Sequence, residues 1–264
     1  MHRLLAGVAS MVLVGAAGAA TVHAQNPDLQ PSRARAIVHP AVAALHGLKG
    51  SAGQTSSNWS GYVATSGGYT HVSGSWRIPT VTVTADDRYS STWVGIGGDP
   101  TPDLIQAGTE QDSVGGKAVY TAWTEILPQP ESVITTMTVS PGDVMNVDIV
   151  QTLTALWKIT VTDSTTGQSF TRSTPYPSLH TTAEWIHEAP TVGGLIANLA
   201  QTSNAVFDGG LANGRPIANA GGVTTIALVD QNSGAQVATP GALDSEGDGF
   251  QVADGATAPP APSS

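Results

Sequence analysis

Apolar and polar residues alternate along most of the chain from Asn58 onward. Segments such as 145–149 (MNVDI) and 157–161 (WKITV) place every second residue on an apolar face, which is typical of β-strands with one side buried. Turn-forming pairs such as Pro141-Gly142 separate these segments, and no long stretch has the spacing of an amphipathic helix. Short strands at this spacing predict an all-β fold, an antiparallel two-sheet β-sandwich.

The first residues have a different pattern. A short basic start precedes an apolar run at 4–20 that is rich in Ala and Gly, and Val22-His23-Ala24 then forms a small-x-small cleavage motif. This order predicts a secretory signal peptide over residues 1–24 and therefore secretion. The run is short for a membrane span and no second apolar stretch follows, so we expect no membrane attachment.

The remaining chain divides into three parts by composition. Residues 25–53 begin polar, pass through a weak helix-like patch and end in Gly, Ser and Gln, which predicts a propeptide; a flexible N-terminal arm is the alternative. Residues 54–252 carry the strand pattern and are predicted to form the β-sandwich domain, with longer loops after residue 195. Residues 253–264 are low in complexity and predicted to be disordered.

Charge is scarce and unevenly distributed. Of the ten basic residues four precede residue 54, and of the twenty acids one does, so the rest carries 6 basic against 19 acidic side chains and a formal net charge of −13. Such a body repels nucleic acid, which we therefore do not expect as a partner. Crowded anions indicate an acidic working environment, and a basic propeptide would dock on this body at neutral pH and leave as the acids protonate. The chain contains no cysteine, so its core rather than disulfides must hold it together.

Several well-known catalytic motifs are absent from the sequence. There is no G-x-S-x-G, no cysteine nucleophile, no H-E-x-x-H and no D-T-G or D-S-G. His180, Glu184 and His187 are close in sequence, but strand alternation turns His187 away from the other two. We therefore expect neither a metal nor another cofactor.

Large polar side chains recur on single faces of several predicted strands. Gln106 and Glu110 share a face in one strand, Trp123 and Glu125 in the next, and Trp93 alternates with glycines in a third. Any one of these faces is typical of the solvated side of a sandwich, whereas together they predict a lined groove. In TTAEWIHEAP (181–190) one face holds Glu184, Ile186 and Glu188, of which Glu188 is interpreted as a rim or loop carboxylate beside Pro190.

Six motifs share an order and a spacing that are specific only when taken together. They are NWSGYV (58–63), VSGSWRIPTV (72–81), STWVGIGG (91–98), IQAGTEQ (105–111), YTAWTEILP (120–128) and AEWIHEAP (183–190). With these motifs the chain resembles the glutamic peptidases of the eqolisin type (peptidase family G1), acid endopeptidases that pepstatin does not inhibit. The resemblance implies a sandwich of the concanavalin/lectin-like jelly-roll type with a concave substrate groove.

The resemblance also implies the roles of individual residues. The matched motifs give Gln106 and Glu184 as the catalytic pair, and Trp93, Trp123, Glu125 and Glu110 as residues that line the groove. A carboxylate can serve first as general base and then, once protonated, as general acid, whereas a glutamine amide can donate to the oxyanion at any working pH. The expected partners are polypeptide substrates and the chain's own propeptide.

Two other functions remain open at this stage. A carbohydrate-binding sandwich could stack sugar rings on Trp93 and Trp123, and a glycosidase could pair Glu184 with Glu110 or Glu125. Gln106 discriminates among them, since the peptidase needs its amide, a glycosidase needs two acids and simple binding needs neither. Nothing in the sequence indicates an interface, so we expect a monomer.

Overall fold

The computed structural model describes residues 26–31, 36–42 and 53–263. The predicted signal peptide lies outside the described residues, as do parts of the predicted propeptide. Within the described ranges, no helix has the length and apolar character needed to cross a membrane.

The described residues form twenty strands and one short 3₁₀ helix, η1 (Ile217–Asn219). In chain order the strands are β1 (Leu29–Pro31), β2 (Ile37–Val38), β3 (Gln54–Ser56), β4 (Trp59–Ala64), β5 (His71–Arg77), β6 (Ser91–Gly97), β7 (Leu104–Val114), β8 (Lys117–Ile126), β9 (Ser132–Ile134), β10 (Val144–Leu153), β11 (Leu156–Asp163), β12 (Ser169–Pro175), β13 (Ala183–Glu188), β14 (Thr191–Val192), β15 (Leu195–Ile196), β16 (Ala205–Ala212), β17 (Arg215–Pro216), β18 (Thr224–Val229), β19 (Gln236–Pro240) and β20 (Phe250–Asp254).

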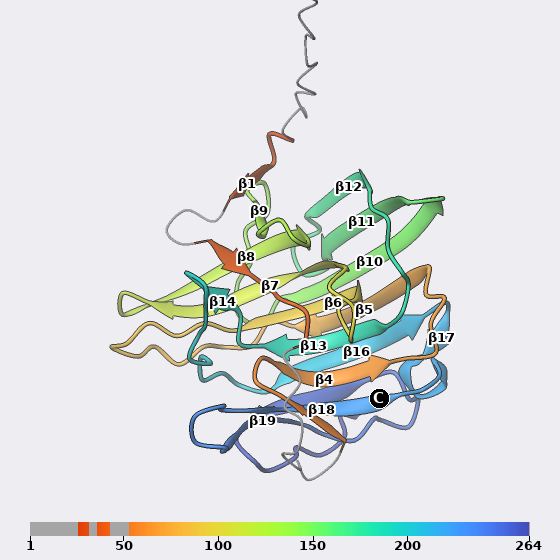
Figure 1. Cartoon of the computed structure of the whole chain (residues 1–264). Coiled ribbons are helices and arrows are strands. Elements are labelled where there is room, and N and C mark those ends of the chain that lie inside the picture. The colour runs from red at the N-terminus through yellow and green to blue at the C-terminus, as the bar shows by residue number, and fades with distance from the viewer. Residues whose placement is uncertain (1–25, 32–35, 43–52, 264) are drawn as a thin grey trace, which may run out of the picture.

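These strands form two packed layers that are joined at one edge (Figure 1). The first layer runs β9–β8–β7–β6–β13–β4–β18, and the second runs β12–β11–β10–β5–β16–β20–β19. Pairing of β18 with β19 connects the layers, and every named pairing is antiparallel except that of β18 with β3. The predicted all-β, antiparallel two-sheet sandwich is confirmed.

The apolar core lies between the layers. Alternation in β10 and β11 turns Val147 and Ile159 inward, where both are buried, as the sequence pattern predicts. Trp185 of β13 crosses the interior and donates from Nε1 to the carbonyl of Ser73 in β5 at 2.8 Å. A Cβ at Gly74 would lie 2.9 Å from the Trp185 ring, so this glycine lets the tryptophan reach the opposite sheet.

The central strands of the first layer are buried on both faces. Every residue of β6 and β13 is buried. One face packs on the inter-sheet core, and the other carries a second apolar cluster that includes Trp59, Trp93, Trp123 and Ile186, with Val42 packed against it. The outer face of this layer is therefore covered, and part of the cover comes from the predicted propeptide.

The C-terminal region completes the second layer. Strands β16 and β20 pair beside β5, and β20 extends to Asp254. Beyond it, the carbonyl of Pro260 accepts a hydrogen bond from Nε2 of Gln251 at 3.2 Å, and Pro259 packs against Gly241. Low complexity predicted disorder for residues 253–264, whereas Pro259 and Pro260 contact Gly241 and Gln251.

Candidate active site

One row of paired residues crosses four strands of the first layer. Glu184 of β13 pairs with Gly95 of β6, Gly95 pairs with Gln106 of β7, and Gln106 pairs with Glu125 of β8. Directly paired residues point to the same face of a sheet. The three polar side chains therefore lie on the outer face of the first layer, and we call this surface the polar face.

Gly95 leaves space between the two residues predicted to be catalytic. Two strand spacings separate Glu184 from Gln106 by about 9.5 Å at the backbone. A Cβ at Gly95 would lie 3.0 Å from the Trp93 ring and 3.1 Å from the Gln106 Cβ. The absence of a side chain at this position lets both polar groups reach toward a common point above the sheet.

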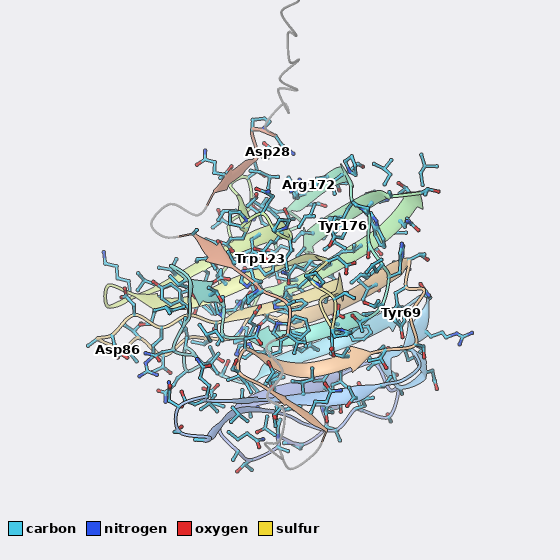
Figure 2. The ribbon with its side chains drawn as sticks, in the orientation of Figure 1. Asp28, Tyr69, Asp86, Trp123, Arg172 and Tyr176 are labelled. Atoms are coloured by element: carbon cyan, nitrogen blue, oxygen red, sulfur yellow. The ribbon has the colours of Figure 1, made fainter. Side chains whose placement is uncertain are left out.

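The other predicted site residues lie on the same face. Glu110 stands four residues after Gln106 on β7, and Trp93 and Trp123 belong to the outer apolar cluster. All are buried, and Figure 2 shows Trp123 in the densely packed middle of the molecule. The structure thus brings the six predicted residues together on one surface, while their roles stay predictions.

Residues 36–42, which we call the crossing segment, lie over the polar face. Ile37 and Val38 form β2 and pair with β14, and the carbonyl of Ile37 accepts from the backbone N–H of Glu131 at 3.2 Å. After β2 the chain passes in front of β7 and β6 toward β13 (Figure 1). It then donates from the Val42 N–H to the carbonyl of Gly98 at 2.9 Å.

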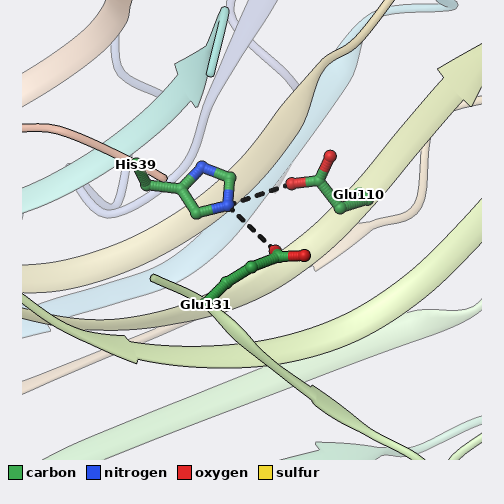
Figure 3. Close-up of side chains that lie close together, drawn as sticks. All are labelled: His39, Glu110 and Glu131. Carbon is green, nitrogen blue, oxygen red and sulfur yellow. Dashed lines mark hydrogen bonds and ion pairs between the residues drawn. The ribbon is translucent and has the colours of Figure 1, made fainter. Parts of the chain in front are cut away.

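The side chain of His39 is the centre of these contacts. Its ring stacks on Trp123 with 3.9 Å between centroids and 8° between planes. Nε2 lies 3.1 Å from Oε1 of Glu110 and 3.2 Å from Oε2 of Glu131 (Figure 3). On the other side of the ring, Nδ1 lies 3.1 Å from Oε2 of Glu188. We call Glu110, Glu131 and Glu188, together with Trp123, the carboxylate cage.

The carboxylate cage holds His39 as a cation. Burial acts to lower the pKa of His39, but the close contact and the charge of Glu110, together with hydrogen bonds that the ring donates to Glu131 and Glu188, raise this pKa well above its usual value. An imidazolium has a donor at both ring nitrogens, which matches carboxylates on both sides. The buried positive charge is thereby compensated.

The backbone of His39 meets the predicted catalytic row. Its N–H donates to Oε2 of Glu125 at 3.0 Å, and its carbonyl accepts from Nε2 of Gln106 at 2.8 Å. The same Nε2 donates to Glu125 at 2.6 Å, and this bond fixes the orientation of the amide. Gln106 therefore presents an N–H to a peptide carbonyl oxygen, which is the geometry of an oxyanion donor.

Glu184 is buried without a partner. Neither of its carboxyl oxygens has a hydrogen bond among the described residues. Burial raises the pKa of Glu184 well above its usual value; the Thr182 hydroxyl, which is close but outside hydrogen-bonding geometry, opposes the shift, and the charges of Asp99 and Asp103 add to it. A side chain in this state is ready to accept a bond from another molecule.

Glu188 is held by several donors. Its Oε2 accepts from Nε1 of Trp93 at 2.7 Å, and its Oε1 accepts from Nε1 of Trp59 at 3.2 Å and from the side-chain amide of Asn58 at 3.3 Å. Burial still raises the pKa of Glu188, with His39 acting to lower it. The prediction of a rim carboxylate is wrong, because β13 continues to residue 188 and the tryptophans close over it.

Two groups among the described residues have His or acid ligand atoms close enough to suit a metal ion. They are His39–Glu110–Glu131 and the more exposed Asp208–Asp244–Asp248. In the first group the His39 nitrogen is already within ion-pair distance of both acids. The sequence trio of His180, Glu184 and His187 is not brought together, because His187 points to the inter-sheet side and contacts Thr92 at 3.1 Å.

Sequence reasoning missed three residues of this surface. Glu131, Trp59 and His39 are not among the residues that the sequence motifs assign to the site. The one available signal was the position of Glu131 in a charge-poor chain, directly before a short strand. A pocket of ≈ 350 Å³ lined by residues such as Leu199 and Asp230 contains none of the predicted site residues, since the crossing segment fills the surface where they lie.

The two-sheet sandwich, with a glutamine and a glutamate in one row across its first layer, has the features that the resemblance to glutamic peptidases implies. The family model described as the Peptidase A4 family matches residues 57–251. The chain therefore belongs to the Peptidase A4 family, and the predicted resemblance to eqolisin-type glutamic peptidases is confirmed.

Curated relatives agree with this family. Aspergillopepsin-2 of Aspergillus niger is 29% identical over 176 residues, which cover 58% of this chain and 62% of that protein. Scytalidopepsin B of Scytalidium lignicola is 28% identical over 137 residues, 50% of this chain and 51% of that protein. The matched regions thus span between half and two thirds of these relatives.

Solved structures give the same fold. Scytalido-glutamic peptidase with a transition state analog inhibitor superposes with a TM-score of 0.63 at 20% identity, over 75% of this chain and 98% of that chain. Aspergilloglutamic peptidase from Aspergillus niger superposes with a TM-score of 0.53 at 26% identity, over 63% and 99%. Because the first of these is 20% identical, the similarity to it shows the fold alone.

Proposed function

We propose that this chain is a glutamic endopeptidase that hydrolyses peptide bonds in polypeptides with Glu184 and Gln106. One observation carries the proposal: Nε2 of Gln106 donates at 2.8 Å to the carbonyl of a peptide that lies across the polar face. That carbonyl stands where a substrate carbonyl would stand. Glu184 lies in the same row and has no hydrogen-bond partner in the described part of the chain, so it is the group left to act on water.

The reaction then has two proton transfers. Glu184 as carboxylate takes a proton from water, and the resulting hydroxide adds to the substrate carbonyl carbon. The oxygen of that carbonyl becomes an oxyanion, which the Gln106 N–H stabilises; donors of this kind contribute about 3 kcal/mol. Protonated Glu184 next gives its proton to the leaving nitrogen, the C–N bond breaks, and the carboxyl group is ready for another turn.

The pKa of Glu184 is raised in the state in which residues 36–42 lie over the polar face. In this state the pKa of Glu184 lies well above that of an ordinary glutamate, because burial favours its neutral form. A substrate and its water would supply the donors that Glu184 lacks when the crossing segment is in place. Hydrogen bonds to the ionised form lower a pKa, so the working value moves back toward the usual acidic range.

The same proposal extends to the N-terminal part. Residues 1–24 would direct secretion, and residues 25–53 would act as a propeptide that keeps the precursor inactive. The support is that residues 36–42 occupy the polar face and place a backbone carbonyl on Gln106. Removal of this segment would then be a condition of activity.

The test compares purified precursor preincubated at pH about 3.5 and at pH about 7, a range that spans glutamate titration. Cleavage of a denatured protein is followed with pepstatin present. Wild type should cleave after acid treatment, and Glu184→Gln and Gln106→Ala should not. Glu246→Gln, the same change at an exposed position, is the matched control and should behave as wild type.

Two results would refute the proposal. One is a folded, processed wild type that cleaves nothing; binding to polysaccharides would then be examined. The other is full activity of Glu184→Gln. A glycosidase has less support, because the row that holds Glu184 pairs it with a glycine and an amide before the next acid is reached.

A further inference from the structure

The carboxylate cage has no part in the proton transfers assigned to Glu184 and Gln106. Its members come from separate elements: Glu110 from β7, Trp123 from β8, Glu188 from β13, and Glu131 from the loop before β9. All four side chains are at most 1% exposed. Three buried acids in one place are costly unless a cation regularly sits among them.

The geometry of the carboxylate cage selects a flat cation. The 3.9 Å stacking distance on Trp123 admits a planar ring, and an attractive cation–π term adds to the contact. Acids on opposite edges of the ring require an N–H on each edge. A planar cation with N–H groups on opposite edges meets both conditions, and the imidazolium of His39 is the one that fills the cage here; a phenyl ring lacks the donors, and an ammonium group is not planar.

The position of Gln106 fixes which substrate residue the carboxylate cage would receive. Gln106 donates to the carbonyl of His39, the residue whose side chain fills the cage. In a substrate, the residue whose carbonyl accepts from the oxyanion donor is the one on the N-terminal side of the bond that breaks. The crossing segment therefore lies as a substrate would, with His39 before that bond and Pro40 after it.

We infer that the carboxylate cage is a specificity subsite for a protonated histidine side chain, so that the enzyme cleaves preferentially after histidine. This inference rests on the proposed function, because Gln106 as oxyanion donor sets the register. Glu131 then acts as a specificity-determining residue that contacts the substrate side chain. The crossing segment occupies the subsite with the chain's own His39.

The charged groups around the imidazole determine the conditions of the test. Those that contact its ring or its backbone are Glu110 on β7, Glu125 on β8, Glu131 and Glu188, and Asp112 on β7 interacts with the charges of Glu110 and Glu131. A pH of about 5 is below the usual histidine pKa of about 6.5, so a free substrate histidine is charged. All substrates are compared at that one pH.

The experiment uses fluorogenic peptides built on residues 36–42 with the central residue varied and Ala in place of Pro40, AIVXAAV, where X is His, Phe, Lys or Ala. Full chain processed by acid is the enzyme, and the cleaved bond is located by mass spectrometry. The kcat/KM for His should exceed that for Phe and for Lys about tenfold or more, the scale of one charge-assisted hydrogen bond.

Variants assign the preference to the carboxylate cage. Glu131→Gln should lower the ratio of kcat/KM for His over Phe about tenfold, whereas the exposed Glu246→Gln should keep the wild-type ratio. In case Glu131→Gln does not fold, wild type is also inhibited with AIVHPAV and AIVFPAV. The histidine peptide should inhibit at about one tenth of the concentration of the phenylalanine peptide.

Each outcome decides the inference. A histidine preference at the bond after X, or a tenfold stronger inhibition by AIVHPAV, supports it. Cleavage of the series without a histidine preference, or equal inhibition by both peptides, overturns the subsite and leaves the peptidase proposal intact. Failure to cleave both the series and a denatured protein refutes the peptidase proposal itself, and the subsite with it.

Discussion

Glu184 and Glu188 lie four residues apart on the same face of β13, and both are fully buried. Glu188 accepts hydrogen bonds from two indoles and an amide and contacts the His39 ring, whereas Glu184 has no hydrogen bond among the described residues. Desolvation raises the pKa of both. The carboxyl group of Glu188 is thus held by hydrogen bonds, whereas that of Glu184 can still accept hydrogen bonds from another molecule.

The difference shows how one strand can serve two purposes. An unpartnered buried carboxyl destabilises a fold, so its presence indicates a use outside folding. A carboxyl that satisfies two tryptophan N–H groups stabilises the walls of the same surface. If Glu184 is the reacting group, as proposed, the hydrogen bonds of Glu188 keep the walls around it in place.

Among the variants other than Glu184→Gln, the largest effect is expected for loss of the Gln106 amide. Gln106→Ala should lower kcat about 10²–10³-fold, because the oxyanion loses its donor. Single-turnover kinetics on a peptide substrate measures this directly. Gln231→Ala, at an exposed position, is the matched control. An increase in KM with an unchanged kcat would mean that Gln106 binds substrate without stabilising the transition state.

Glu188→Ala should reduce the free energy of unfolding by about 2–4 kcal/mol, since the buried N–H groups of Trp93 and Trp59 lose their acceptor. Urea denaturation of the acid-processed chain measures the change. Glu184→Ala should cost less, because no donor is left behind. Equal destabilisation of the two variants would show that the pairing difference has no energetic weight.

Glu125 should make the fold less stable at neutral pH. Desolvation raises its pKa from 4.5 to about 8, although the charge of His39 acts to lower it. The folded state therefore keeps a proton that the unfolded chain loses above pH 4.5, and stability falls as pH rises toward 8. By pH about 6.5 the loss is about 2.5 kcal/mol. Glu125→Gln should flatten this dependence in urea midpoints; an unchanged slope would contradict the assignment.

His187 gives the smallest effect, with the opposite sign. Burial lowers its pKa from 6.5 to about 4, so the unfolded chain binds the proton first and stability falls as pH drops from 6.5 toward 4. At pH about 5.5 the loss is about 1.4 kcal/mol relative to neutral pH. Thermal melts of His187→Gln should lack this acid-side decrease, and a decrease of equal size would exclude His187 as its source.

Much of the fold follows from residue patterns alone. Alternation in segments such as 145–149 gives strands with one buried side, and many such strands can only bury those sides by forming two layers. Alternation also places Gln106 with Glu110, and Trp123 with Glu125, on common faces. The face to which a side chain of a strand points depends only on its position in that strand, and therefore it can be predicted.

The contacts between strands join residues that are far apart in the sequence, so the patterns within single strands do not predict them. Nothing near Glu188 shows that Trp59, about 130 positions earlier, donates to it. The docking of His39 requires β2 to pair with β14 and Glu131 to approach from a loop. Such contacts depend on the register of distant segments, which single-strand patterns do not contain.

Glu184 should be the reacting carboxyl and Glu188 a structural one, and one paired measurement separates these two roles. Glu184→Gln and Glu188→Gln are assayed on the same peptide, and their urea midpoints are determined in parallel. For Glu184→Gln we expect a loss of kcat of about 10³-fold or more with an unchanged or higher midpoint. For Glu188→Gln we expect a lower midpoint with a far smaller loss of kcat. The reverse pattern would assign the reacting carboxyl to Glu188 and the structural role to Glu184.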